Sequence, residues 1–323
     1  MNTMNCCETC GKQCKNASAY KKHQERKRPC KPHQTRSRFA ETKSPAELVV
    51  EPINQIIDTT SSLREEIIQG DALELLPTLA DNSAQIVLAD PPYNIGKDFG
   101  NDSDRQSMEQ YLSWCEKWIQ ECLRILRPNG TMFVFGFSEN LALILSKIPL
   151  HIHRRWIVWH YTNKNMASLH FWQRSHESIL ILWKEDKVFH RDDIREPYTD
   201  GFLKGAAGKQ RAATQGRFSK GDKTTTYTAH PEGALPRDVI KIPALAGGAG
   251  KKERVDHPTQ KPLALCEKLL KSCKQDPSQG FVLVPFAGSG SECLAAKNLH
   301  LPFVGIEINP EYVSLIQSRI GTS

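Results

Sequence analysis

Residues 86–94 read Ile-Val-Leu-Ala-Asp-Pro-Pro-Tyr-Asn, an apolar run that ends at an acidic residue and two prolines. The apolar run predicts a buried strand. Because proline has no N–H to donate and restricts the residue before it, the strand cannot continue through Pro91 and Pro92. Asp90 and Tyr93 are therefore predicted to leave the sheet at its carboxyl edge, where open α/β sheets bind their ligands. A proline turn with a surface aspartate and a packed tyrosine is the structural alternative.

A second stretch, residues 281–308, predicts a nucleotide-binding turn. An apolar strand at 281–285 runs into Phe-Ala-Gly-Ser-Gly-Ser at 286–291, a helix follows, and a strand at 303–308 contains Glu307 near its end. The glycines allow the backbone to approach a ligand, and the acid can accept hydrogen bonds from ribose hydroxyls. This arrangement is typical of a site for an adenosine-containing cofactor.

The rest of the chain from residue 64 onward alternates strand and helix patterns, which predicts a doubly wound α/β sheet. We expect strands at 65–71, 86–89, 131–137, 281–285 and 303–308, and helices at 72–79, 111–126, 141–148 and 291–299, with a further helix that residues 257–262 open and that runs to about 273. The segments 155–159 and 178–183 predict a hairpin at the sheet edge. If the 281–285 strand is central, the sheet reverses its winding between that strand and 86–89. The cofactor turn and Asp90 then meet at this switch point.

The basic charge of the chain is concentrated at the N-terminus. The first 43 residues hold 11 Lys and Arg against 3 Asp and Glu, which leaves 32 against 33 in the other 280. The segment 185–255 is rich in glycine and small polar residues, with several basic residues between 201 and 225. Both features are typical of surfaces that meet nucleic-acid phosphates. A solvated basic tail and a disordered loop are the alternatives.

The N-terminal residues 1–33 have the spacing of a zinc finger. Cys7 and Cys10 form a C-x2-C pair, and twelve residues separate Cys10 from His23, as in a C2H2 finger. For the fourth ligand the sequence leaves Cys30 or His33 open. Cys14 stands where such fingers usually have an aromatic residue. A segment this short could fold only with Zn²⁺ bound, and a disordered Cys-rich tail is the alternative.

Composition excludes a membrane protein and a secreted one. No apolar run approaches membrane-spanning length, and the polar N-terminus lacks the apolar core of a signal peptide. Outside the N-terminal segment the cysteines occur singly in apolar contexts, which predicts buried thiols in a reducing compartment. We therefore expect a cytoplasmic protein, associated with nucleoid or nucleus according to the host, with residues 34–63 as a linker.

Three motifs occur in a fixed order: Asp-Pro-Pro-Tyr at 90–93, His-Pro-Thr-Gln-Lys-Pro at 257–262 and Phe-Ala-Gly-Ser-Gly at 286–290. In this combination residues 64–323 resemble the amino-group DNA methyltransferases of the beta arrangement. The resemblance implies a Rossmann-like methyltransferase sheet with circularly permuted motif order. S-adenosylmethionine is the implied cofactor and double-stranded DNA the partner, with 185–255 as the target-recognition insert. It also leaves open a cognate restriction endonuclease and a homodimer.

The resemblance assigns roles to individual residues. Asp90 and the carbonyl of Pro91 would accept the N–H groups of a flipped-out base, and Tyr93, after Pro92, would stack on that base. The implied cofactor contacts are Asp71 with the adenine, Glu307 with the ribose, Thr259 and Lys261 with the methionine end, and Phe286, Ala287, Gly288, Ser289 and Gly290 along the turn. For Lys261, an ordinary surface lysine at a helix start is the alternative.

Two points limit what the resemblance implies. The family commonly has Asp before Pro-Phe in the cofactor motif, whereas this chain has Val284, which removes a loop-stabilising contact and predicts weaker cofactor binding. Asp at position 90, where cytosine-N4 enzymes more often have Ser, favours adenine N6 as the acceptor. Cytosine-N4 methylation and a catalytically silent DNA-binding protein are the alternatives.

Overall fold

The computed structural model describes residues 17–24, 64–97, 99, 104–163, 168–216, 220–221 and 223–321. The chain divides into two compact units, Met1–Asn54 and Gln55–Ser323. In the first unit the described element is helix α1 (Ala17–Gln24), which contains His23. The predicted zinc ligands Cys7, Cys10 and Cys30 lie outside the described residues, as does the predicted linker 34–63.

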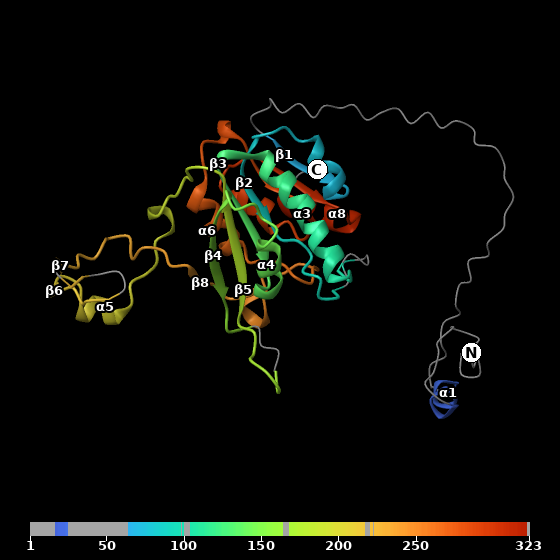
Figure 1. Ribbon diagram of the computed structural model, residues 1–323, viewed down its shortest axis with the longest axis horizontal. Helices are drawn as coiled ribbons and strands as arrows, with labels where there is room; N and C mark the ends of the chain where they lie inside the picture. Colours follow the sequence, from blue (N-terminus) through green and yellow to red (C-terminus); the bar gives the residue numbers. More distant parts are fainter. Residues whose placement is uncertain are drawn as a thin grey trace. The chain divides into compact units, whose positions relative to one another are not determined.

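The second unit is built on an eight-stranded sheet in the order β1-β10-β9-β2-β3-β5-β4-β8 (Figure 1). The first five strands are parallel, β5 is antiparallel to both its neighbours, and β8 is parallel to β4. The strands are β1 (Glu65–Gln69), β2 (Ala84–Ala89), β3 (Leu126–Gly136), β4 (His153–His160), β5 (His176–Trp183), β8 (Val239–Lys241), β9 (Phe281–Val284) and β10 (Phe303–Glu307).

Helices cover both faces of the sheet. The residues of β2 show why: Val87 and Ala89 point into one apolar cluster, whereas Ile86 and Leu88 point into the other, because successive strand residues face opposite sides. The first cluster contains α2 (Ala72–Leu75), α3 (Met108–Ile125) and α4 (Ser138–Leu145), and the second contains α6 (Leu263–Cys273), α7 (Ser291–Asn298) and α8 (Pro310–Ile320). Short 3-10 helices occur at Leu76–Thr78, Asp192–Ile194, Gly247–Gly250 and Pro277–Gln279.

The predicted topology is confirmed in its central part. β9 is flanked by β10 and β1 on one side and by β2 and β3 on the other, so the sheet changes its winding between β9 and β2. The predicted buried thiols are also confirmed, because Cys115, Cys122, Cys266, Cys273 and Cys293 are buried and free. The carboxyl ends of β9 and β2, where Gly288 and Asp90 follow, are therefore neighbours.

Two sequence predictions differ from the structure. The helix α3 ends at Ile125, and β3 begins at once at Leu126 rather than at Thr131. Leu126 pairs with Ala84, and the irregular register that follows accommodates Pro128. The β4–β5 hairpin is present, but it is not at the edge, because β8 adds to β4 beyond it.

The predicted insert 185–255 contributes both to the sheet and to a separate ribbon. β8 from this segment extends the main sheet. In the described part of the chain β6 (Gln210–Ala212) and β7 (Thr224–Thr226) pair only with each other, and they follow α5 (Asp200–Gly205). Among the described helices none is long and apolar enough to cross a membrane.

Helix α3 begins with a capping box, which offers a test of local stability. The Ser107 hydroxyl accepts from the Gln110 N–H at 3.2 Å, and the Ser107 N–H donates to the Gln110 side chain at 3.2 Å. We expect Ser107→Ala to lower the free energy of unfolding by about 1 kcal/mol in urea titrations. Ser113→Ala, an exposed site in the same helix, should be neutral or slightly stabilising. Equal losses in both variants would contradict the capping role.

Candidate active site

The segment after β2 is held by hydrogen bonds from two helices. The Tyr111 hydroxyl on α3 donates to the Pro92 carbonyl at 2.9 Å, and the Asn140 side-chain amide on α4 donates to the Tyr93 carbonyl at 2.6 Å. The two prolines end β2 as predicted, and Asp90 follows its last residue. The structure therefore fixes the backbone of the Asp-Pro-Pro-Tyr motif from both sides.

The loop beyond this motif is organised by Asp104, which is fully buried. Its carboxylate accepts backbone N–H groups from Asn94, Ile95 and Lys97. Asn94 has a φ of 57°, a left-handed conformation that asparagine tolerates better than most residues. Its side-chain amide exchanges hydrogen bonds with the backbone of Gln106, which closes the loop.

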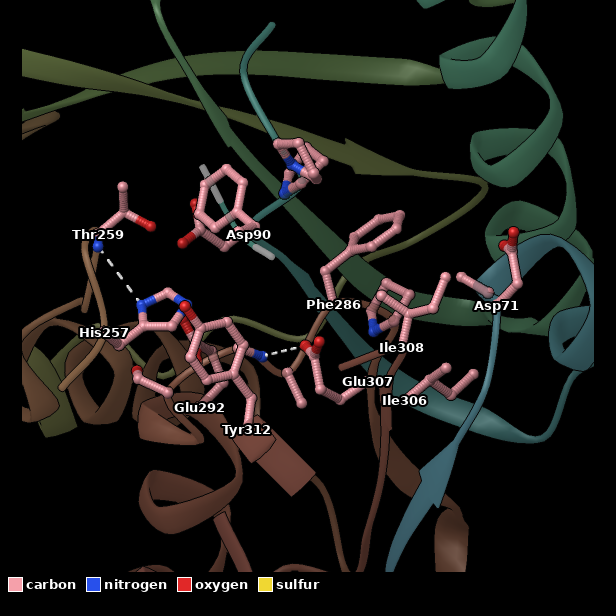
Figure 2. Close-up of a pocket in the computed structure, with 18 of the residues that line it drawn as sticks. Asp71, Asp90, His257, Thr259, Phe286, Glu292, Ile306, Glu307, Ile308 and Tyr312 are labelled. Carbon is pink, nitrogen blue, oxygen red and sulfur yellow. Dashed lines mark hydrogen bonds between the residues drawn. The ribbon is translucent and has the colours of Figure 1, made fainter. Parts of the chain in front are cut away.

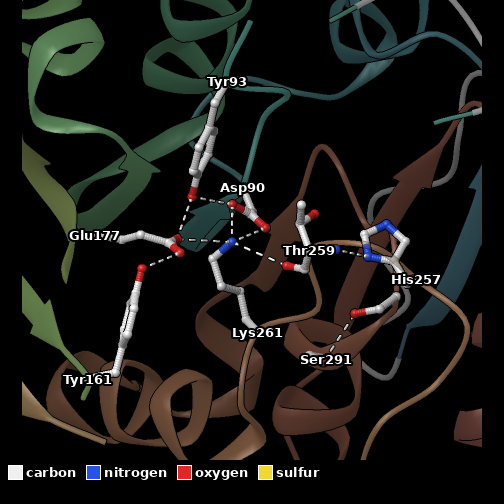
Figure 3. Close-up of polar contacts among 9 residues, drawn as sticks. Asp90, Tyr93, Tyr161, Glu177, His257, Thr259, Lys261 and Ser291 are labelled. Carbon is white, nitrogen blue, oxygen red and sulfur yellow. Dashed lines mark hydrogen bonds and ion pairs between the residues drawn. The ribbon is translucent and has the colours of Figure 1, made fainter. Parts of the chain in front are cut away.

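Asp90 belongs to a buried polar cluster (Figure 3). The Lys261 ammonium lies 2.7 and 2.6 Å from the two Asp90 oxygens and 3.6 Å from a carboxylate oxygen of Glu177. The Tyr93 hydroxyl lies 2.9 Å from Asp90 and 3.1 Å from Glu177, and the Tyr161 hydroxyl donates to Glu177 at 3.4 Å. The Tyr93 hydroxyl has one proton, so it can donate to one carboxylate at a time.

The cluster sets one lysine cation against two carboxylates. Burial raises the pKa of Asp90, and the opposing effect of Lys261 leaves it above its ordinary value. Burial acts to lower the pKa of Lys261, but Asp90 and Glu177 outweigh it and the net shift is upward. The pKa of Tyr93 is raised well above 10 by burial and by the same two acids. Lys261 is therefore charged, and Tyr93 neutral, at physiological pH.

A cavity opens beside this cluster at the carboxyl ends of β9, β10 and β1 (Figure 2). Most of the predicted cofactor residues line it together with the first three residues of the Asp-Pro-Pro-Tyr motif: Asp71, Asp90, Pro91, Pro92, Thr259, Phe286, Ala287, Gly288, Ser289 and Glu307. Lys261 lines instead a second, larger cavity with Tyr93, Glu177 and Tyr161. Asp90 is thus on the wall of the first cavity and bonded to residues of the second.

Glu307 and the glycine turn hold each other in place. The two Glu307 oxygens accept the N–H of Gly288 at 2.7 Å and that of Asn309 at 2.8 Å. Burial raises the pKa of Glu307, and these backbone N–H groups offset part of the rise. Gly288 and Gly290 have φ of 47° and 76°, and a Cβ at Gly288 would lie 2.9 Å from the His257 ring. Glycine is therefore required at this approach.

Two further predicted residues also have structural roles. Asp71 caps α2 by accepting the Leu73 N–H at 2.8 Å. Phe286 packs against Trp114 and Trp118 of α3, with ring centroids 5.4 and 5.1 Å apart. His257 is packed beside Tyr312, and burial lowers its pKa to about 4, so its ring is neutral near pH 7.

The sequence did not predict four candidate site residues: Glu177, Tyr161, Glu292 and Asp104. Glu177 lies in β5 and Tyr161 directly follows β4, and the sequence predicts these two strands from the alternation of apolar residues alone. An acid within the apolar run that follows His176 was the available signal, because strands seldom bury a carboxylate without a partner. Glu292 lies two residues beyond Gly290, where the cofactor contacts predicted for the turn end.

Comparison with known proteins gives the family. An N6/N4 family model described as DNA methylase matches residues 84–318, which are most of the chain and contain the motifs at 90–93, 257–262 and 286–290. The chain belongs to this DNA methylase family. It is therefore an S-adenosylmethionine-dependent DNA methyltransferase, and the predicted α/β methyltransferase fold is confirmed.

Individual relatives are similar over the same part of the methyltransferase. A DNA adenine methyltransferase of Escherichia coli, YhdJ, is 31% identical over 257 residues, which cover 79% of this chain and 82% of the relative. The type II methyltransferase M.HpaI of Haemophilus parainfluenzae is 29% identical, with coverage of 79% and 74%. The structure of the PvuII cytosine-N4-specific DNA methyltransferase is 15% identical with a TM-score of 0.55, covering 78% of this chain and 85% of that one. This last similarity shows the fold alone.

The residues that line the first cavity suit S-adenosylmethionine, the cofactor of this family. Its carboxylates can accept hydrogen bonds from ribose hydroxyls and from cationic groups. The glycine turn brings backbone atoms close to a ligand, and Phe286 offers an aromatic face. The zinc prediction has no counterpart in the described part of the chain, where no group of three or more His, Cys, Asp or Glu could hold a metal ion. Three of its four ligands lie outside that part.

The charge balance of the buried cluster can be tested by removing its cation. We expect Lys261→Met to lower the free energy of unfolding by about 3–5 kcal/mol near pH 8, because Asp90 and Glu177 stay buried without a cation. Without Lys261 the pKa of Asp90 would rise further, so the loss should shrink as pH falls and Asp90 binds a proton. Urea unfolding at about pH 5 and about pH 8 measures this.

A double variant is the matched control. Asp90→Asn with Lys261→Met restores the net charge of the cluster, so it should recover part of the lost stability at the higher pH. A Lys261→Met variant that loses the same stability at both pH values would contradict the electrostatic explanation.

Proposed function

We propose that the chain transfers a methyl group from S-adenosylmethionine to N6 of an adenine that is flipped out of double-stranded DNA. The observation that carries this proposal is the position of Asp90. Its carboxylate is on the wall of the candidate cofactor cavity and is hydrogen-bonded to Tyr93, which lines the adjoining larger cavity. The methyl donor and the base that accepts the methyl group can therefore meet at one carboxylate.

The acceptor chemistry requires a fixed hydrogen-bond acceptor. The lone pair of an exocyclic amine is delocalised into the base ring, so the nitrogen is a poor nucleophile until it pyramidalises. S-adenosylmethionine, when bound, supplies the methyl group on its sulfonium sulfur. Asp90 would accept one N–H of the amine, the Pro91 carbonyl another, and Tyr93 would stack on the base. A carboxylate oxygen has room for a further donor beside Lys261.

The charge of the buried cluster supports the same chemistry. With both carboxylates and Lys261 ionised, the cluster carries one net negative charge. As the amine attacks, positive charge develops on its nitrogen, and a preorganised negative site stabilises that change. Asp90 then accepts the proton that the methylated nitrogen must lose.

The choice of adenine rests on two supports. Asp is present at position 90, and the relative from Escherichia coli is named a DNA adenine methyltransferase. Cytosine N4 is the second candidate, since the PvuII cytosine-N4-specific enzyme has a similar fold. We propose the segment 185–255 as the part that contacts the target DNA. A cognate restriction endonuclease and a homodimer stay predictions of the sequence.

The catalytic role of Asp90 can be tested directly. We expect Asp90→Ala to lower methyl transfer to DNA by about 100-fold or more, because the amine loses its acceptor in the transition state. Glu109→Ala, an exposed acid at the start of α3, should keep full activity. Mass spectrometry of the hydrolysed DNA identifies the product, and N4-methylcytosine would replace the adenine assignment. Full activity in Asp90→Ala would refute the mechanism.

We also propose that the N-terminal segment 1–33 binds one structural zinc through Cys7, Cys10, His23 and Cys30 or His33. The support is the spacing of these residues in the sequence, together with the basic charge around them. With zinc bound, this segment would fold as a finger that adds affinity for DNA or localises the enzyme.

Metal analysis of the purified full chain tests the zinc proposal. We expect close to one zinc per chain, and a large loss in Cys10→Ser. Cys14→Ser is the matched control and should keep its zinc, because Cys14 stands where a finger usually has a core residue rather than a ligand. Protein that contains no zinc, or equal loss in both variants, would refute the proposal.

A further inference from the structure

Glu292 is a buried acid that the proposed mechanism does not use. It is in the first turn of α7, its exposed fraction is 3%, and it lines the candidate cofactor cavity. The carboxylate is approached by its own backbone N–H, and in the described part of the chain no side chain hydrogen-bonds to it. A buried carboxylate that has no side-chain partner is costly unless a ligand provides one.

The other three acids of this cavity already have partners. Asp71 caps α2, Glu307 accepts two backbone N–H groups, and Asp90 is paired with Lys261. Each of these carboxylates therefore has a protein partner before any ligand binds, and its remaining lone pairs can still accept from a ligand. Glu292 is the acid in this cavity that is left to meet a cationic group.

Glu292 is also at the end of the cavity where a methyl donor would have to react. Asp90 is near enough to raise its pKa, and Lys261 and Arg319 are near enough to lower it. Figure 2 shows Glu292 near His257 and Tyr312, and Asp71 well apart from them. If Asp71 and Glu307 hold the adenosine, Glu292 faces the amino-acid part of the ligand.

We propose that the carboxylate of Glu292 binds the α-ammonium group of S-adenosylmethionine. This inference rests on the proposed function and adds a residue that fixes the methionine end of the cofactor. The ligand has two positive groups, the ammonium and the sulfonium. An ammonium has three N–H donors for a carboxylate, whereas a sulfonium has none, so the carboxylate of Glu292 fits the ammonium.

Titration provides a second readout. Burial first and Asp90 second raise the pKa of Glu292 to about 7 without ligand. The charged and titratable groups that face it are Asp90 after β2, Lys261 before α6, Cys266 of α6, Cys293 of α7 and Arg319 of α8, with His257 and Tyr312 beside it in the cavity. A bound ammonium favours the ionised acid, so cofactor affinity should fall as pH drops below about 7, with proton release on binding near that pH.

Calorimetry with three ligands tells whether Glu292 binds the ammonium, binds the sulfonium or has a structural role. S-adenosylmethionine carries both positive groups, S-adenosylhomocysteine carries the ammonium alone, and 5′-deoxy-5′-methylthioadenosine carries neither. We expect Glu292→Gln to weaken the first two by a similar factor, about tenfold to 100-fold. The third should bind the variant and the wild type equally, which also shows that the variant is folded. The pH dependence of the first two should flatten in the variant.

Each other outcome overturns the inference. Equal weakening of all three ligands would mean a structural role, loss confined to S-adenosylmethionine would assign Glu292 to the sulfonium, and no change would leave it without a ligand. Glu74→Gln, an exposed acid on α2, is the matched control and should bind like the wild type. Wild-type protein that binds no S-adenosylmethionine would refute the proposed function itself, and the inference with it.

Discussion

The pairing of Lys261 with Asp90 and Glu177 is the interaction on which the site depends. It joins three segments that are distant in the sequence: the end of β2, strand β5 and the segment before α6. One cation cannot neutralise both carboxylates, so the cluster stays together only while all members are hydrogen-bonded. Tyr93 and Tyr161 supply the remaining donors. The half of the site that would hold the target base is thus built by charge pairing and hydrogen bonds.

The sheet order determines where this cluster meets the cofactor cavity. Because β9 and β2 are neighbours with opposite winding beyond them, the glycine turn and the Asp-Pro-Pro-Tyr motif emerge at the same edge. Nearly two hundred residues separate the two motifs in the chain. Neither motif needs a long loop to reach the other, since parallel pairing of the two strands already places their carboxyl ends together.

The parts of the fold that follow from local patterns could be predicted from the sequence. The Pro-terminated strand, the glycine turn and the order around β9 were all expected, because periodicity and proline act over a few residues. The start of β3 at Leu126 and the pairing of β8 with β4 depend on long-range register, which no local pattern contains. Glu177 and Glu292 were missed for a similar reason: an acid in an apolar strand or a helix start becomes a site residue only through what packs against it.

Helix α3 links the two halves of the site. Tyr111 holds the carbonyl of Pro92, and one and two turns further along Trp114 and Trp118 hold the ring of Phe286. These residues recur at helical spacing, so a single rigid element supports the motif that would bind the base and the turn that would bind the cofactor. A rotation of α3 about its axis would move both supports together. The packing of α3 therefore helps to set the distance between the methyl donor and the target base. The tryptophans of α3 contribute to the site as well as to the core.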